Sequence, residues 1–129
     1  MTDPITDMLN QIKNGEAVAK PEVLIKFSNL KNEFAKILAE AGFILEIKKI
    51  AKGKAKSMKI ILKYNGKEPA ISGFKRVSKP GQRIYVKADE IKKVRQGYGI
   101  SIISTPKGLM TNTQAKKTKL GGELMAEVW

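Results

Sequence analysis

The chain has 129 residues, 42% of them hydrophobic and 29% charged, which is ordinary for a folded protein and too apolar for a disordered tail. It carries 25 basic and 12 acidic side chains, so its net charge is +13 and its expected partner is an anion. It has no cysteine and no histidine, which excludes a disulfide framework and a thiolate metal site and removes the commonest general base.

The first third of the sequence predicts two helices with a strand between them. Apolar residues recur at helical spacing from Pro4, and the first helix is expected to end at Gly15. Residues 22–27 read as a strand, and Ser28 is expected to cap a second helix that Gly42 ends. The apolar face of the second helix consists of Leu30, Phe34, Ile37, Leu38 and Ala41.

From residue 43 the hydrophobic period changes to two, which is typical of a half-buried strand. Phe43, Leu45 and Ile47 are expected on one face of this strand. After a basic loop at residues 51–57, the alternation resumes over residues 58–64. The two segments together predict an antiparallel hairpin with a lysine-rich tip.

Short strands and turns are predicted in the middle of the chain. Residues 70–78 and 83–88 read as strands, and residues 79–82 as the proline-glycine turn between them. Asp89 is expected to cap a short helix that carries Ile91 and Val94 and ends before residue 98.

The last part of the chain predicts a strand and a proline turn over residues 99–108. Thr111 and Gln114 form an S/T-x-x-E/Q capping box, which predicts a short helix over residues 112–118. The final strand is expected over residues 123–129. One of its faces would carry Leu124, Ala126 and Val128.

Together these elements predict an α+β chain of two small lobes. Residues 1–64 would form an N-terminal lobe of order α-β-α-β-β, and residues 65–129 a mainly β lobe with short helices. No run approaches the roughly eighteen apolar residues of a membrane helix, and the N-terminus lacks the blocks of a signal peptide. We therefore expect a cytoplasmic protein without a membrane segment.

Positive charge is concentrated in the last two thirds of the chain. Residues 1–47 hold five lysines and seven acids, whereas residues 48–129 hold 20 basic and five acidic side chains. Of all the cations 22 are lysine and three are arginine, which favours point-charge contacts to phosphates over bidentate reading of bases. Any sequence selectivity must therefore come from other residues.

Little in the sequence supports catalysis. The twelve carboxylates show no spacing that marks a catalytic pair, and Asp89 and Glu90 adjoin where capping explains acidic residues. Ser104 and Lys107 are surrounded by neither a complete phosphate-binding loop nor a nucleophile elbow. We therefore expect no enzyme, no cofactor and no small-molecule substrate.

The loop at residues 104–108 has two interpretations. Its proline, glycine and hydroxyl residues suit a plain turn between strands. It also places hydroxyls and Lys107 near the basic helix of Lys116 and Lys117, and no acid occurs from residue 91 to residue 122. Such a loop can hold phosphates and read an unpaired base or a 2′-hydroxyl.

Two tyrosines have different expected roles. Tyr85 stands between Arg83 and Lys87 and is expected on the charged face of its strand, where it would stack on a base or merely cover the sheet. Tyr98, between two glycines, is expected to be a packing anchor.

Three motifs occur in order along essentially the whole chain: DPITDMLNQIKNG, RVSKPGQRIY, and IISTPKGLMT followed by a short basic helix and LGGEL. They resemble protein eight of the bacterial small ribosomal subunit. The resemblance implies a two-lobed α+β ribosomal protein that binds the central domain of small-subunit ribosomal RNA early in assembly. It also implies translational repression through its own operon mRNA, and proteins five and twelve of the subunit as neighbours.

The resemblance assigns the main RNA contact to the C-terminal lobe. Ser104 and Thr105 would read an extruded adenine and its neighbours, while Lys107 and Gly108 would shape and charge the loop. Tyr85 would lie against the RNA backbone. The other expected contacts in this lobe are Arg83, Pro106, Lys116, Gly121, Gly122 and Glu123. Weaker contacts are expected from Thr2, Asp3, Thr6, Lys13 and Asn14.

Two of these positions are unusual for an RNA contact. Many members of the family carry serine where this chain has Pro106, so one hydroxyl is lost and the loop is stiffer. Glu123 is an acid beside expected phosphates. It would accept a hydrogen bond from a base or from the loop backbone, or else only orient the double glycine.

Overall fold

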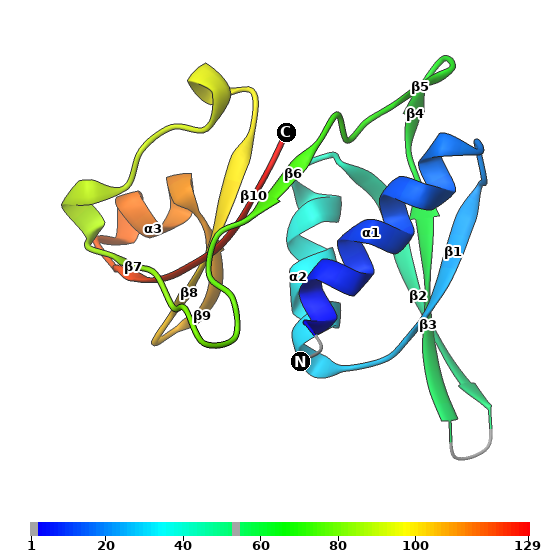
Figure 1. Ribbon diagram of the computed structural model, residues 1–129, viewed down its shortest axis with the longest axis horizontal. Helices are drawn as coiled ribbons and strands as arrows, with labels where there is room; N and C mark the ends of the chain where they lie inside the picture. Colours follow the sequence, from blue (N-terminus) through cyan, green and yellow to red (C-terminus); the bar gives the residue numbers. More distant parts are fainter. Residues whose placement is uncertain (1–2, 53–54) are drawn as a thin grey trace. The chain divides into compact units, whose positions relative to one another are not determined.

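The computed structural model describes residues 3–52 and 55–129 (Figure 1). Its contacts group the chain into two compact units, one reaching to Ile71 and the other spanning Ser72–Trp129. Helices combine with antiparallel sheets in the chain, which confirms the predicted α+β class. The lobe boundary predicted between residues 64 and 65 stays a prediction.

The first unit packs two helices against a three-stranded antiparallel sheet of order β1-β3-β2. Its elements are α1 (Pro4–Ala17), β1 (Glu22–Lys26), α2 (Asn29–Glu40), β2 (Ile44–Lys52), β3 (Ala55–Leu62), β4 (Tyr64–Asn65) and β5 (Glu68–Pro69). β4 and β5 form a separate two-stranded ribbon. The buried apolar residues of the helices and of β3 include Ile5, Met8, Leu9, Ile12, Phe34, Leu38, Met58 and Ile60.

Helix α1 begins as predicted but runs past its expected end. The Asp3 side chain accepts a hydrogen bond from the Ile5 amide at 3.2 Å, which caps the helix. Gly15 lies within the helix and does not end it. A Cβ on Gly15 would stand 2.6 Å from Cγ1 of Val23, so glycine is needed here for close packing of α1 on β1. The chain leaves the helix at Ala19, whose φ is +55°.

Helix α2 has both predicted ends. Ser28 Oγ accepts a hydrogen bond from the Lys31 amide at 3.1 Å, and Gly42 follows the helix with a φ of +85°. Two residues of its expected apolar face are wrong, since Leu30 at the first turn is 41% exposed and Ala41, just after the last turn, is exposed as well. Phe34 and Leu38 are fully buried.

The hairpin of β2 and β3 is confirmed, but the expected alternation of β2 is wrong. The pairing register shifts between Ile44 and Glu46, which is a β-bulge. Phe43 and Ile44 are consequently both buried, whereas Leu45 is 58% exposed. Most of the predicted loop is strand, and residues 53–54 of its tip lie outside the described residues.

The second unit is built on an antiparallel sheet of order β6-β10-β8-β9, with β7 also paired to β10 (Figure 1). Its elements are β6 (Phe74–Arg76), β7 (Tyr85–Val86), η1 (Ala88–Glu90), η2 (Arg95–Gly97), β8 (Ile100–Thr105), β9 (Gly108–Thr111), α3 (Asn112–Thr118) and β10 (Gly122–Val128). Both hydrogen bonds of the predicted capping box form, at 3.1 and 3.2 Å between Thr111 and Gln114.

A second β-bulge disturbs the last strand. The register of β10 against β8 shifts between Leu124 and Ala126, so Met125 is the extra residue and is itself buried. Leu124 and Ala126 therefore lie on opposite faces of the sheet. The strict alternation expected from the sequence, which puts them on one face, is wrong.

The helix predicted after Asp89 does not form. The Lys87 amide is satisfied by Glu90 Oε1 at 3.0 Å, and the chain makes only the 3-10 turn η1 before Ile91 becomes extended. This path lets the Ile91 side chain reach the core of the unit. Tyr98 is 86% exposed, so its expected role as a packing anchor is wrong.

Trp129 is held at one edge of the second unit. The Arg95 guanidinium lies 4.1 Å from the centre of its ring. The Trp129 amide donates to the Gly73 carbonyl at 3.0 Å, and a Cβ on Gly73 would stand 2.9 Å from the ring. Gly73 is therefore needed where the indole packs on the backbone.

Glu16 is a buried acid in α1 that we expect to reduce stability at neutral pH. Its side chain is 1% exposed, and the Lys13 ammonium lies 3.8 Å from Oε1. Burial raises the pKa of Glu16 above its ordinary value of 4.5, although Lys13 acts in the opposite direction. A raised folded-state pKa gives stability that is present at low pH and is lost as the pH rises through the folded value.

We expect Glu16→Gln to raise the free energy of unfolding at pH 7 by about 1 kcal/mol, because it removes a buried charge. Urea unfolding at pH 7 and at pH 5 measures the effect, and the advantage of the variant should shrink at the lower pH. Glu40→Gln, at an exposed position of α2, is the matched control. A Glu16→Gln variant that is less stable than the original at pH 7 would contradict this account.

Candidate nucleic-acid interface

Three candidate residues lie in one row across the sheet of the second unit. Glu123 on β10 is paired with Tyr85 on β7 and with Ser104 on β8. Ser104 is paired in turn with Leu109 on β9. Directly opposite residues of antiparallel strands point to the same face, so Tyr85, Glu123 and Ser104 share a face. We call these three residues the cross-strand row.

Residues adjacent in sequence to this row point to the other face. Ile103 and Met110 pack there against Ala115 of α3, together with Leu124. Helix α3 therefore covers the face opposite the cross-strand row. Lys116 is exposed on α3, so the structure does not bring it to the face of Ser104.

The double glycine lets β10 fit between its neighbours. A Cβ on Gly122 would overlap the carbonyl oxygen of Ser104, and a Cβ on Gly121 would stand 2.5 Å from the carbonyl oxygen of Val86. Both contacts are with backbone, which cannot move aside as a side chain can. These glycines set the spacing within the cross-strand row, and the structure gives them this packing role.

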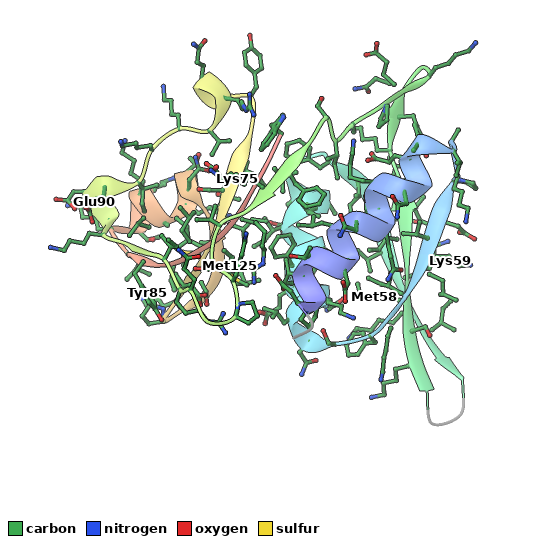
Figure 2. All side chains as sticks on the ribbon, in the orientation of Figure 1. Met58, Lys59, Lys75, Tyr85, Glu90 and Met125 are labelled. Atoms are coloured by element: carbon green, nitrogen blue, oxygen red, sulfur yellow. The ribbon has the colours of Figure 1, made fainter. Side chains whose placement is uncertain are left out.

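Glu123 is paired with a cation. Its Oε2 lies 3.0 Å from Arg83 Nη1, and its side chain is 19% exposed while that of Arg83 is 49% exposed. The pair explains how an acid is accommodated on a basic surface. It also holds the Arg83 guanidinium on Glu123, the residue that β-pairing sets opposite Tyr85. Tyr85 is 69% exposed and lies on β7 (Figure 2). The predicted position of Tyr85 on the charged face agrees with this exposure.

The turn between β8 and β9 is closed by the Thr105 hydroxyl. Thr105 Oγ1 donates to the Gly108 carbonyl at 2.7 Å and accepts from the Lys107 amide at 3.2 Å. Gly108 has a φ of +106°, which favours glycine. Pro106 and Lys107 are exposed at the tip of the turn. The Thr105 hydroxyl therefore shapes the loop, whereas half-buried Ser104 belongs to the cross-strand row.

We expect Thr105→Val to lower the free energy of unfolding by about 1–2 kcal/mol, because it removes both hydrogen bonds and keeps the branched shape. Thr105→Ser should retain most of the stability, since its hydroxyl can make the same contacts. Thermal unfolding of both variants tests this, with Thr113→Val at an exposed position of α3 as the control. Equal loss in the valine and serine variants would contradict the role of the hydroxyl.

The weaker candidates belong to the other unit and are partly engaged there. The Thr6 hydroxyl donates to Asp3 Oδ2 at 2.6 Å, within the cap of α1. Lys13 Nζ donates to the Ile71 carbonyl at 3.1 Å. Asn14 is exposed, and Thr2 lies outside the described residues.

The site offers hydrogen-bond donors, acceptors and cations rather than a reactive centre. Within residues 3–52 and 55–129 there is no group of three carboxylate, histidine or cysteine residues that could hold a metal ion. In the same residues, none of the helices has the length and apolar character needed to span a membrane. A phenol, a hydroxyl and an arginine-carboxylate pair beside a lysine turn suit the backbone and edges of RNA.

Comparison with known proteins gives consistent matches. The family model of Ribosomal protein S8 matches residues 3–129. Small ribosomal subunit protein uS8 of Clostridium novyi (strain NT) is 47% identical, over 100% of this chain and 98% of that protein. The proteins of the same name from Caldanaerobacter subterraneus subsp. tengcongensis and Kosmotoga olearia are 48% and 46% identical, over 100% and 99% of this chain and 98% of each relative.

Proposed function

Because the chain belongs to the ribosomal protein S8 family, we propose that the cross-strand row binds the central domain of small-subunit ribosomal RNA early in assembly. The family assignment made from the three sequence motifs is confirmed. It makes the chain a structural constituent of the small subunit of the cytoplasmic ribosome, a protein that binds ribosomal RNA and not an enzyme.

The observation that supports the proposed site is the pairing of Glu123 with both Tyr85 and Ser104. Three side chains of different hydrogen-bonding character are held on one face by backbone pairing. Such a face can distinguish RNA by the edges of unpaired bases and the 2′-hydroxyl. Lys107 and Arg83 beside it supply the phosphate contacts that bring RNA to the face without selecting a sequence.

The test is a titration of the chain with a transcript of the central domain and a shuffled transcript at two salt concentrations. If about five phosphates are neutralised, log K for the first transcript should fall against log salt with a slope of roughly −3.5 to −4.5. The shuffled transcript should bind more weakly at both concentrations. A response to salt that is nearly flat, or equal affinity for duplex DNA, would contradict a selective RNA site.

We further propose that the same face binds the mRNA of an operon that encodes ribosomal proteins, and thereby represses its translation. A site that recognises an irregular helix and its unpaired bases will accept any RNA that presents the same shape. The mRNA segment should therefore compete with the central-domain transcript for one site, and binding of both at once would contradict the proposal.

We also propose proteins five and twelve of the small subunit as neighbours, on the resemblance of the sequence to its family. Cross-linking within assembled subunits would test this. The proposal would be contradicted if this chain formed cross-links with subunit proteins but with neither protein five nor protein twelve.

A further inference from the structure

We propose that the second unit carries another anion-binding site, on the side of α3, that holds the phosphate backbone of a different RNA segment from the one on the cross-strand row. This inference rests on the proposed RNA-binding function and extends it. The chain would then connect two segments of RNA through opposite faces of one small sheet.

The site is a pocket of about 320 Å³ between α3 and the segment that follows η1. Lys92 and Lys93 line one side, and Lys116 and Lys117 of α3 line the other. All four residues are exposed. Its volume is at the lower end of the range for pockets that hold small ligands, which suits one phosphate with its sugar.

A buried amide fixes the two sides of the pocket relative to each other. Asn112 is 7% exposed and lies at the start of α3. Its Nδ2 donates to the Lys92 carbonyl at 3.3 Å, and its Oδ1 accepts from the Ser101 amide at 3.4 Å. The backbone segments that carry the lysines are therefore held in place before a ligand binds, which reduces the entropy lost on binding.

The charge around the pocket is unbalanced. No acid lines it, and within the described part of the chain none of the four ammonium groups forms an ion pair with a carboxylate. Glu90 and Glu127 lie in an adjoining pocket that shares Lys92 and Lys93. Four like charges gathered without a partner favour binding of an anion.

The chemistry of the pocket favours phosphate over an acidic protein segment. Lysine contacts phosphate as a point charge, and exposed Thr113 adds a hydroxyl to the same wall. A protein partner would be expected to insert apolar anchors, but the apolar side chain in the lining, Ile91, is 6% exposed. RNA backbone is therefore the ligand class that the residues fit.

The position of the pocket makes the second segment distinct from the first. Helix α3 packs on the face that carries Ile103, whereas Ser104 points to the opposite face. Lysines on the outer side of α3 and the cross-strand row are therefore separated by the sheet itself.

The variant that tests the site is Lys93→Gln combined with Lys117→Gln. It is titrated with the central-domain transcript and with the shortest fragment of it that still binds. On the transcript we expect about tenfold weaker binding at 0.1 M salt and a salt slope reduced by roughly 1.4–1.8. On the short fragment we expect less than a twofold change. Lys26→Gln with Lys36→Gln removes the same charge from exposed positions of the first unit and is the control.

A second measurement uses inorganic pyrophosphate and follows the backbone amide signals of the intact chain by NMR. The signals of residues 92, 93, 116 and 117 should move together in the original protein and stay in place in the double variant. The proposal would be overturned if the double variant lost the same affinity for both RNAs or lost no affinity for the transcript. It would also be overturned if pyrophosphate shifted amide signals scattered over the surface. The proposal would also be overturned if the double variant lost binding to polyglutamate but bound the transcript as the original protein does. The pocket would then fit an acidic protein segment and not RNA.

These results are separable from failure of the proposed function. If the original protein binds central-domain and shuffled transcripts equally, the selective role of the cross-strand row is wrong. The pyrophosphate shifts still decide whether the lysine pocket binds phosphate.

Discussion

Replacing Gly122 with alanine is expected to lower the free energy of unfolding by about 3 kcal/mol and to abolish the preference for central-domain RNA. The added methyl group would overlap the Ser104 carbonyl, which is backbone of the neighbouring strand. The strands must separate to admit it, and Glu123 and Ser104 would lose their alignment. Stability and selectivity should therefore fall together.

Urea unfolding and RNA titration of the same preparation test both parts of this expectation. The control is Gly97→Ala, since Gly97 has a φ of +97° but nothing within 4 Å of an added Cβ. It should lose only the roughly 1 kcal/mol of an alanine in the left-handed region. A stable Gly122→Ala variant with unchanged affinity would show that β10 does not depend on this close approach.

Replacing Ser104 with alanine is expected to weaken binding to the central-domain transcript by about 1–3 kcal/mol, which is roughly 5- to 150-fold. The stability of the chain should change little. Ser104 is half-buried, and its hydroxyl makes no hydrogen bond with the described residues. The hydroxyl is therefore available to RNA, in contrast to that of Thr105.

The measurement compares the original protein and the Ser104→Ala variant on the cognate and shuffled transcripts. Ser57→Ala, on β3 of the other unit, is the matched control and should bind both transcripts as the original does. If Ser104→Ala weakened both transcripts equally, the hydroxyl would contribute to general affinity and not to selection.

Features set by neighbouring residues could be predicted from the sequence. The cap of α1 at Asp3, the cap of α2 at Ser28 and the capping box of α3 follow from side chains that satisfy free amides within four residues. The proline turn over residues 105–108, with glycine at its last position, follows from an equally local rule. These rules are local, so one sequence is enough to apply them.

Features set by packing between distant segments could not be predicted in this way. The bulges at Leu45 and Met125 depend on how a strand pairs with its neighbour, and a hydrophobic period of two does not reveal an inserted residue. The sequence predicted a helix end at Gly15 because glycine often follows a helix. Its close contact with Val23, which explains a glycine inside α1, exists only in the folded chain.

The candidate site was predictable in its residue types but not in its arrangement. Alternation along one strand was sufficient to put Tyr85 on an exposed face. The pairing of Arg83 with Glu123 joins residues forty positions apart, and no local pattern indicates it. The separation of Lys116 from Ser104 likewise depends on which face α3 covers.

The packing of Trp129 on Gly73 and Arg95 makes tryptophan fluorescence a probe of unfolding in this chain. Trp129 is the one tryptophan of the sequence, and all three residues belong to the unit Ser72–Trp129. Its fluorescence therefore follows that unit alone, whereas circular dichroism follows the helices and strands of both. If the two signals change at different urea concentrations, the units unfold separately, and the order of the transitions shows which is the less stable.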